Sequence, residues 1–448
     1  MTTHKHLKQR IRSRMGKTGE RYAAARAHVL SERSPGGTAP PTAAGWEYCG
    51  GTHPDTAALA NVLRNLGVAA PHTGRPLSEA LVLGVGGGLG AGYILWEFAQ
   101  HDARILVLGF RHSWQYPARW AATTAERLGL HADLHETGGA RSAAARLDDV
   151  LGRGLPAVLW ADQQRLGYRH LPAWLDCYGR NPVVAVGGDA EHVLLDDLGV
   201  APLTVERARL ADARARVGSY KHRLIATDPA LVQVDAERLR AAVEEGIAAQ
   251  VAHLQGRSDS FSLPAWRKWA RLSTDGRNRK SWPNVFADRR GLASALVSIY
   301  EGAGPRPGST VASGAGNLRA LYADFLEEAA PLLDAPGVVG AAPAFREAAA
   351  AWATLVDAAL PPGHPRLGRL RELVDGTERA VAAGDAGAAE AKTLAAEHWA
   401  LQEGLDRDPW LNESDQTDLL SDLGARVERI FAVESEAVAV LAAARPSR

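Results

Sequence analysis

Apolar residues in the first half of the chain fall into short runs that alternate with helical patterns. From Thr56 to Leu66 they recur at helical spacing, with Pro54 and Asp55 before them and Gly67 after them, which predicts a helix. Runs of strand length lie at 80–85, 104–110, 155–162, 181–188 and 192–199. Because the last three runs follow one another closely, we predict an α+β fold whose sheet is completed by neighbouring antiparallel strands.

The second half of the chain has a different pattern. Beyond about residue 205 the strand-length runs fade and helical periodicity recurs towards the C-terminus. We therefore predict an α+β domain over 46–204 and an all-α domain over 205–448. A basic segment over 1–34 predicts a helical arm, and the Pro-, Gly- and Ala-rich stretch over 35–45 predicts a linker.

Composition narrows the classes of protein. A length of 448 residues predicts two or three domains, and 46% apolar with 23% charged residues excludes a largely disordered chain. The 51 basic residues balance the 51 acidic ones, so neither nucleic acid nor a membrane surface is a predicted partner. The two cysteines are too few for a disulfide framework, and without a long apolar segment we expect a cytoplasmic protein.

The glycine-rich string from Gly84 to Gly92 follows an apolar run. A strand ending here would let the backbone at Gly86, Gly87 and Gly88 approach a pyrophosphate or a methyl donor at a helix N-terminus. The spacing departs from the dinucleotide fingerprint, and the next run does not end in an acidic residue. A tight turn that permits close packing is the alternative interpretation, and no cofactor is predicted.

A thiol, an imidazole and a carboxylate cluster around the start of the helix near Pro54. A helix N-terminus stabilises a thiolate, so Cys49 is a candidate nucleophile and His53 a candidate base. Asp55 and Thr56, in the first turn, are candidate substrate-binding residues. The structural alternatives are a buried small side chain for Cys49 and a capping or packing role for His53.

Other candidates follow the later runs. Asp162 and Asp196 are candidate catalytic carboxylates and Tyr168 a candidate cleft residue, although carboxylates at strand ends also form turns. Trp282 lies in a segment rich in Trp, Arg and Lys, 266–291, which predicts either helix packing or an aromatic, cationic lip for an anionic substrate. The histidines show no metal-ligand spacing, so no metal site is predicted.

Several segments carry a family resemblance. GGTHPDTAALANVLRNLG, PLSEALVLGVGGGLG and RGLPAVLWADQQRLGYRHLP resemble the N-terminal domain of butirosin biosynthesis protein H, an acyltransferase family of antibiotic pathways. SWPNVFADRRGLASALVSIYEG and LRALYADFLEEAA are similar to the uncharacterised helical domain that often follows it. The resemblance implies a papain-like (C39-like) fold for the first domain and transfer of an acyl group from a carrier-protein thioester to an amine.

The resemblance also implies a Cys-His-Asp arrangement. Its His-Cys pair falls on His53 and Pro54, so proline stands where the family has its nucleophile. The later His of the family falls at Asn181 or Pro182, and Asp196 or Asp197 matches its Asp. Losing a nucleophile removes the acyl-enzyme route.

Three functions follow as expectations. The first is a family member that acts on an acyl, aminoacyl or peptidyl substrate, with an acyl carrier protein as a candidate partner and with altered or non-covalent chemistry. In that case His53 would deprotonate the amine and backbone N–H groups of 84–90 would stabilise the oxyanion, or Cys49 would replace the missing thiol. The second is a catalytically silent binding protein, and the third is a nucleotide- or methyl-donor-dependent enzyme.

Overall fold

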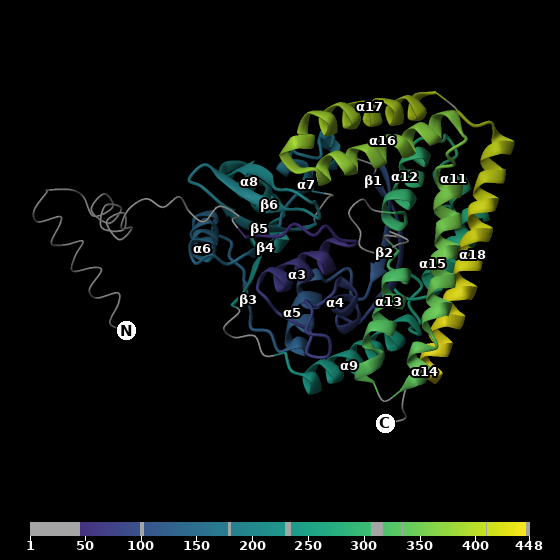
Figure 1. Ribbon diagram of the computed structural model, residues 1–448. Coiled ribbons are helices and arrows are strands. Elements are labelled where there is room, and N and C mark those ends of the chain that lie inside the picture. Colours follow the sequence, from purple (N-terminus) through teal and green to yellow (C-terminus); the bar gives the residue numbers. More distant parts are fainter. Residues whose placement is uncertain are drawn as a thin grey trace, which may run out of the picture. The chain divides into compact units, whose positions relative to one another are not determined.

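Residues 43–448 form one compact unit in the computed structural model of this protein (Figure 1). The structure describes residues 45–98, 103–177, 181–228, 234–305, 317–333, 335–408 and 410–444. The predicted arm over 1–34, and all of the predicted linker except Gly45, lie outside the described residues. A sheet-containing N-terminal region precedes an all-helical C-terminal region, which confirms the predicted α+β class.

Six strands of the N-terminal region form one antiparallel sheet, in the order β3-β8-β4-β5-β6-β7. Their bounds are β3 (Ala132–His135), β4 (Ala157–Trp160), β5 (Pro182–Gly188), β6 (His192–Asp196), β7 (Leu203–Glu206) and β8 (Leu224–Thr227). The runs over 155–162, 181–188 and 192–199 became the neighbours β4, β5 and β6, as their close spacing predicts. Every residue of β4 is buried, which explains why its sequence is uniformly apolar.

One strand lies where only helices are predicted. β8 comes after residue 204, yet it is inserted between β3 and β4. Its four residues are too few to show a period of their own, so the sequence pattern does not reveal it. The boundary between the two predicted domains stays a prediction.

A separate two-stranded antiparallel ribbon consists of β1 (Leu89–Phe98) and β2 (Ala103–Arg111). An isolated ribbon of this kind is marginally stable in water. Here helices of the C-terminal region pack against it, with α10 (Pro264–Thr274) on β1 and α12 (Leu292–Ala303) on β2. The ribbon is therefore held in place by the helical half of the chain.

Six helices belong to the N-terminal region: α3 (Pro54–Asn65), α4 (Glu79–Val85), α5 (Pro117–Leu128), α6 (Ala140–Gly152), α7 (Gln163–Leu166) and α8 (Arg207–Arg216). The predicted helix after Pro54 is confirmed as α3. The run over 80–85, predicted as a strand, is α4, and that prediction is wrong. Ser78 caps this helix by accepting the backbone N–H of Leu81, and all seven residues of α4 are buried, so its apolar pattern has no helical period to detect.

The remaining helices form the C-terminal region together with α10 and α12. Their bounds are α9 (Ala236–Leu254), α11 (Trp282–Val285), α13 (Arg319–Ala329), α14 (Pro336–Val339), α15 (Ala342–Ala359), α16 (Pro365–Ala382), α17 (Ala388–Arg407) and α18 (Glu413–Ala443). Figure 1 shows α18, in yellow, running alongside α15, which it contacts. Among the described residues, no helix combines the length and apolarity needed to cross a membrane.

A buried ion pair joins the ribbon to the helical region. Glu434 of α18 accepts hydrogen bonds from the guanidinium of Arg319, at 2.7 and 2.8 Å, and from the indole N–H groups of Trp266 and Trp352, at 3.0 and 2.6 Å. Arg319 also donates to the backbone oxygen of Gly90, in β1, at 3.0 Å. Each buried charge is thus paired and hydrogen-bonded, which a buried ion pair requires.

Candidate functional site

One cavity, called here the ribbon cavity, collects residues that lie far apart in the sequence. Its volume is about 690 Å³. The ribbon supplies an apolar wall through Ile94, Trp96, Phe98, Ile105, Val107 and Phe110. Residues 52–55 at the start of α3, and Asn181 with Pro182 at the start of β5, also line it. The cavity therefore brings the two segments that carry the family resemblance together against an apolar surface.

The start of α3 places two predicted site residues, His53 and Asp55, on the cavity wall together with Pro54. Pro54 is the first helical residue, where its missing N–H costs nothing and its fixed φ suits the helix. His53 is the N-cap, and its Nδ1 accepts the backbone N–H of Asp55 at 3.2 Å. Capping therefore fixes both the position and the ring orientation of His53. The capping role proposed for His53 from the sequence is present, and the same residue lines the cavity.

This cap determines which nitrogen of His53 carries a proton. Because Nδ1 accepts a hydrogen bond, the neutral imidazole has its proton on Nε2. The same Nδ1 lies 4.0 Å from Oδ2 of Asp55. In its neutral form, His53 can therefore donate a hydrogen bond from Nε2.

Asp55 is held by a buried cation. Its Oδ2 accepts hydrogen bonds from Nε and a terminal nitrogen of Arg111 at 3.1 and 2.7 Å. Arg111 is fully buried, and its guanidinium lies 4.3 Å from the ring centroid of Trp120. Burial lowers the pKa of Arg111, while the Asp55 carboxylate opposes that shift. Asp55 contributes a fixed, neutralised carboxylate to the cavity wall.

Glu79, in the first turn of α4, organises the same loop. Its carboxylate accepts the backbone N–H groups of Thr52 at 2.8 Å and His53 at 2.9 Å, and the hydroxyl of Thr56 at 2.6 Å. Burial raises the pKa of Glu79, and these hydrogen bonds act in the opposite direction. Glu79 lies at the N-termini of both α3 and α4, where the helix dipoles favour an anion. The hydroxyl of Thr56 is thus bound to this carboxylate, and a contact between Thr56 and substrate stays a prediction.

Sequence reasoning missed Glu79, Arg111 and Trp114. Glu79 is the first residue of α4, whose apolar run is predicted as a strand, so the sequence does not indicate a first helical turn there. Arg111 lies in a predicted strand, and the sequence does not indicate which distant residue it pairs with. The ring of Trp114 lines the cavity and lies over Gly92 and Gly109, where a side chain on either glycine would collide with it. The one available signal is a glycine in the predicted run over 104–110, Gly109, which faces Gly92 of the glycine-rich string in the structure.

Cys49 is not among the residues that line the ribbon cavity. Its Sγ donates to the backbone oxygen of Glu47 at 3.6 Å. Burial raises the pKa of this thiol, although Arg64 acts in the opposite direction, so the thiolate required of a nucleophile is disfavoured. The structure therefore does not bring Cys49 and His53 together on the cavity wall.

Asp196 lies at the end of β6 in a buried polar cluster, and its oxygens accept hydrogen bonds from Trp46 at 3.1 Å, Asn61 at 3.4 Å and the backbone of Leu198 at 3.1 Å. Asn61 belongs to α3, so Asp196 ties this helix to the sheet. Asp196 does not line the ribbon cavity. Burial raises its pKa to about 6.

We expect the pH dependence of stability to report the burial of Asp196. The folded chain holds this proton more tightly than the unfolded chain, in which the pKa is near 3.8. The stabilisation is therefore complete below about pH 4 and is lost as the pH rises through about 6, by up to about 3 kcal/mol. Urea unfolding of the wild type and of Asp196→Asn between pH 4 and 7 measures it. Parallel curves for the two proteins would contradict the expectation.

Asp162 is buried and Tyr168 is partly buried, and both form hydrogen bonds within the fold. Asp162 caps α7 by accepting the backbone N–H of Arg165 at 2.9 Å, and it accepts that of Cys177 at 2.8 Å. Within the described residues Asp162, Asp176 and Cys177 come close enough to share an ion, but Asp176 is already paired with two arginines. The hydroxyl of Tyr168 donates to Asp197 at 2.9 Å. Neither Asp162 nor Tyr168 lines the ribbon cavity.

The glycines of the predicted phosphate loop form a tight turn between α4 and β1. The backbone N–H groups of Gly86, Gly87 and Gly88 donate to Val82, Gly84 and Leu83, so all three are used within the turn. A side chain on these glycines would collide with Trp120, His112 or Gln250. The segment leads from a helix into a strand, and it therefore lacks the helix N-terminus on which a nucleotide or methyl-donor site depends.

The predicted aromatic lip lies in the core. Trp266, Trp269 and Trp282 are at most 1% exposed, and the indole N–H of Trp282 donates to the hydroxyl of Tyr93 at 2.9 Å. Trp269 stacks on Tyr93, with 5.4 Å between ring centroids. The three tryptophans are buried, as the helix-packing interpretation predicts. Trp282 does not line the ribbon cavity.

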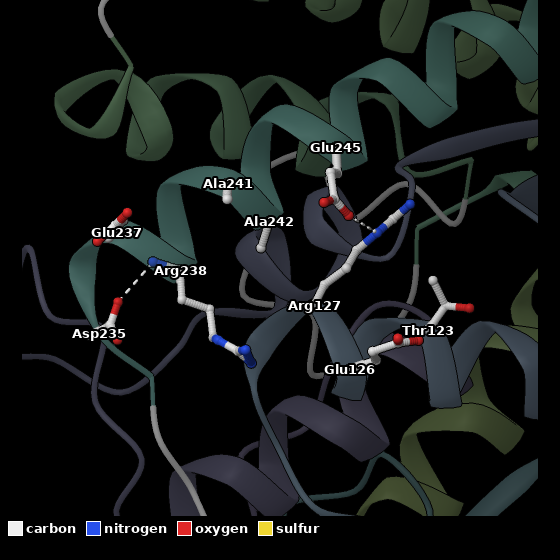
Figure 2. A pocket seen from close by; sticks show the side chains of 9 residues that line it. All are labelled: Thr123, Glu126, Arg127, Asp235, Glu237, Arg238, Ala241, Ala242 and Glu245. Carbon is white, nitrogen blue, oxygen red and sulfur yellow. Dashed lines mark hydrogen bonds and ion pairs between the residues drawn. The ribbon is translucent and has the colours of Figure 1, made fainter.

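A further hollow of about 560 Å³ lies between α5 and the start of α9 (Figure 2). Acidic side chains outnumber the two arginines around it. Arg127 is bound to Glu245 at 3.3 Å and to the backbone oxygen of Val85 at 2.6 Å, and Asp235 caps α9. These interactions cap α9 and hold it against α5. The hollow contains none of the predicted site residues.

A comparison with known families matches a part of the chain that contributes to the wall of the ribbon cavity. Residues 53–198 match the family described as butirosin biosynthesis protein H, N-terminal, and the match includes both segments that meet in the ribbon cavity. No curated protein matches the chain. Residues 53–198 are therefore similar to the butirosin biosynthesis protein H N-terminal family, and the chain continues into an all-helical region.

Proposed function

We propose that this protein binds an acyl or aminoacyl group in the ribbon cavity and acts on it without a covalent acyl-enzyme. One observation carries the proposal. The positions at which the family resemblance places a nucleophile and a base, Pro54 and Asn181 or Pro182, line one cavity, and the described residues around that cavity include neither a cysteine nor a serine. The substrate class and a role in specialised metabolism follow from the family.

The shape and lining of the cavity support an apolar ligand. A volume of about 690 Å³ lies within the usual range for small-molecule sites. The side chains of Trp96 and Phe98 project from the ribbon towards it, and Trp96 is 49% exposed. An exposed tryptophan beside an apolar cavity favours burial of a hydrocarbon or aromatic acyl chain.

Two hydrogen-bond donors support a ligand with a carbonyl group. His53 in its neutral form carries its proton on Nε2, and the buried indole N–H of Trp114 has no acceptor within the described part of the chain. Donors aimed at a carbonyl oxygen stabilise the charge that develops there during acyl transfer. An unprotonated amine would form the C–N bond while the thioester C–S bond breaks. The nitrogen would lose one proton to solvent, and the sulfur would leave as a thiolate that takes one proton from solvent.

A silent binding protein is the second candidate, and the state of Asp55 favours it. Asp55 is neutralised by Arg111 and His53 is fixed as a donor, so neither is placed as a base for an incoming amine. In this alternative the cavity holds the acyl group of a carrier protein or a pathway intermediate without transferring it. The papain-like fold and the carrier-protein partner remain parts of the proposal.

The proposal can be tested with a stable analogue of an acyl thioester. We expect the octanoyl and benzoyl amides of N-acetylethylenediamine, in which an N–H group replaces the thioester sulfur, to bind the wild type. We expect His53→Ala to weaken binding about tenfold, the loss of one hydrogen bond. His364→Ala is the matched control, because His364 caps α16 in the same way but does not line the cavity. Isothermal titration calorimetry measures both variants.

Intact mass spectrometry with the corresponding thioesters completes the test. We expect no acyl adduct on the wild-type protein, and an amide product in the presence of an amine separates transfer from silent binding. An adduct would contradict the non-covalent proposal. Failure of both analogues to bind, or equal effects of the two histidine substitutions, would contradict the assignment of the cavity.

A further inference from the structure

A second cavity lies beside the start of β2, where the helical region meets the loop after α7. Its volume is about 550 Å³, and its lining comes from β2, the short 3-10 helix η1 (Ala173–Leu175), α12 and α17. It shares no lining residue with the ribbon cavity. None of the candidate residues from the sequence lies in it, and it falls partly outside the matched family region.

Two tryptophans form a corner in this cavity. The rings of Trp174, from η1, and Trp399, from α17, are 6.0 Å apart between centroids and inclined at 87°. His398 stacks on Trp399, with 4.5 Å between ring centroids, which holds that ring in place. Trp174 is 40% exposed, so a large aromatic surface remains open to a ligand. Perpendicular indoles present two faces that are negative at their centres.

The charges around the corner favour a cation. Asp406 of α17 lines the cavity, and its Oδ1 accepts the backbone N–H of Gly291 at 2.9 Å, which fixes the carboxylate. The two arginines of the lining are committed elsewhere, because Arg104 and Arg290 both bind Asp288 at 2.8 Å. Their positive charge is shared with that carboxylate, and Asp406 forms no ion pair within 4 Å among the described residues. Burial raises the pKa of Asp406, and the more distant Arg104 and Arg290 offset part of this rise.

We propose that the Trp174–Trp399 corner binds a small organic cation, a primary amine or a quaternary ammonium, that faces Asp406. A cation within about 6 Å of an indole centroid is attracted by the ring, and a nearby carboxylate adds to this attraction. The inference does not depend on acyl binding in the ribbon cavity. The site would recognise an amine-bearing molecule by its charge and by an apolar body that fits against the indoles.

Three ligands of nearly equal shape but different charge show which charge the site prefers. Benzylamine is a cation, benzyl alcohol is neutral and benzoate is an anion at pH 7. We expect the wild type to bind them in that order, with benzylamine at least tenfold tighter than benzoate by calorimetry or ligand-observed NMR. Tightest binding of benzoate would overturn the proposal, because it would show that Arg104 and Arg290 dominate the site.

Substitutions then locate the site. We expect Trp399→Leu and Trp174→Leu each to weaken benzylamine at least fivefold, and Asp406→Asn to remove the preference for benzylamine over benzyl alcohol. Trp96→Leu is the matched control, an exposed tryptophan of the ribbon cavity that should leave benzylamine binding unchanged. Thermal unfolding checks that each variant is folded. Unchanged benzylamine affinity in the folded Trp174→Leu protein would overturn the proposal, and loss with Trp96→Leu would move the cation to the ribbon cavity.

Discussion

Replacing Pro54 with cysteine is expected to create a reactive nucleophile in the ribbon cavity. The new thiol would be the first helical residue of α3, beside the N-cap His53 and on the cavity wall. A helix N-terminus lowers the pKa of a thiol and favours the thiolate. In a Cys49→Ser, Cys177→Ser background, Pro54→Cys should attack octanoyl-N-acetylcysteamine, forming one S–C bond and releasing free N-acetylcysteamine. Intact mass should increase by one octanoyl group.

Pro117 supplies a close control for this experiment. It is the first residue of α5, a helix of the same length as α3, and it lines the same cavity. Its N-cap is Tyr116, which makes no side-chain capping bond, so Pro117→Cys has the helix dipole without the histidine. We expect acylation at position 54 to be at least tenfold faster than at position 117. Equal rates would show that the start of α3 has no special geometry for acyl transfer.

The same comparison separates two accounts of the missing nucleophile. If Pro54→Cys is acylated and then transfers the group to an amine, the remaining residues of the cavity can support catalysis, and the proline alone removes the covalent route. If the adduct accumulates without transfer, the segment at Asn181 and Pro182 lacks a base, as its residue types indicate. Pro182→His would then be the next substitution to examine.

Much of the fold could be predicted from local patterns. The larger apolar residues after Pro54 recur at helical spacing and Gly67 supplies a stop signal, so α3 is evident from the sequence, although the structure buries every residue from Thr56 to Leu63. The runs over 181–188 and 192–199 lie next to each other and pair as β5 and β6. In contrast, α4 is buried on all sides, so its apolar residues carry no period and it could not be distinguished from a strand.

The site was harder to predict because it depends on the ribbon. The sequence pattern predicts a turn or loop for the glycine-rich string, whereas Gly90 and Gly92 belong to β1, which pairs with β2. That pairing creates the apolar wall and places Arg111 against Asp55. For the tryptophans at 266 and 269, the spacing of three residues on a helix is typical of a buried face, and the structure buries both, as the helix-packing interpretation predicts.

Removing the charge of Arg319 is expected to be the most destabilising single substitution among those considered. Arg319 and Glu434 are 0% and 2% exposed, so Arg319→Met would leave a buried carboxylate without its cation. The expected loss in the free energy of unfolding is about 3–5 kcal/mol, measured by urea denaturation. Arg346→Met is the matched control. Arg346 also lies in a helix and pairs with Asp324 and Glu327, but it is 44% exposed, and its loss should cost less than about 1 kcal/mol.

A double substitution distinguishes the loss of the ion pair from the cost of leaving the Glu434 carboxylate buried without a cation. Arg319→Met with Glu434→Leu removes both charges and should recover part of the lost stability, but not all, because the indole N–H groups of Trp266 and Trp352 would lose their acceptor. Arg319 also donates to Gly90 at 3.0 Å, so both proteins should exchange the amide hydrogens of the ribbon faster than the wild type. Unchanged ribbon exchange in the folded Arg319→Met protein would show that the helices hold the ribbon without this pair, and that the cavity wall is independent of the helical core.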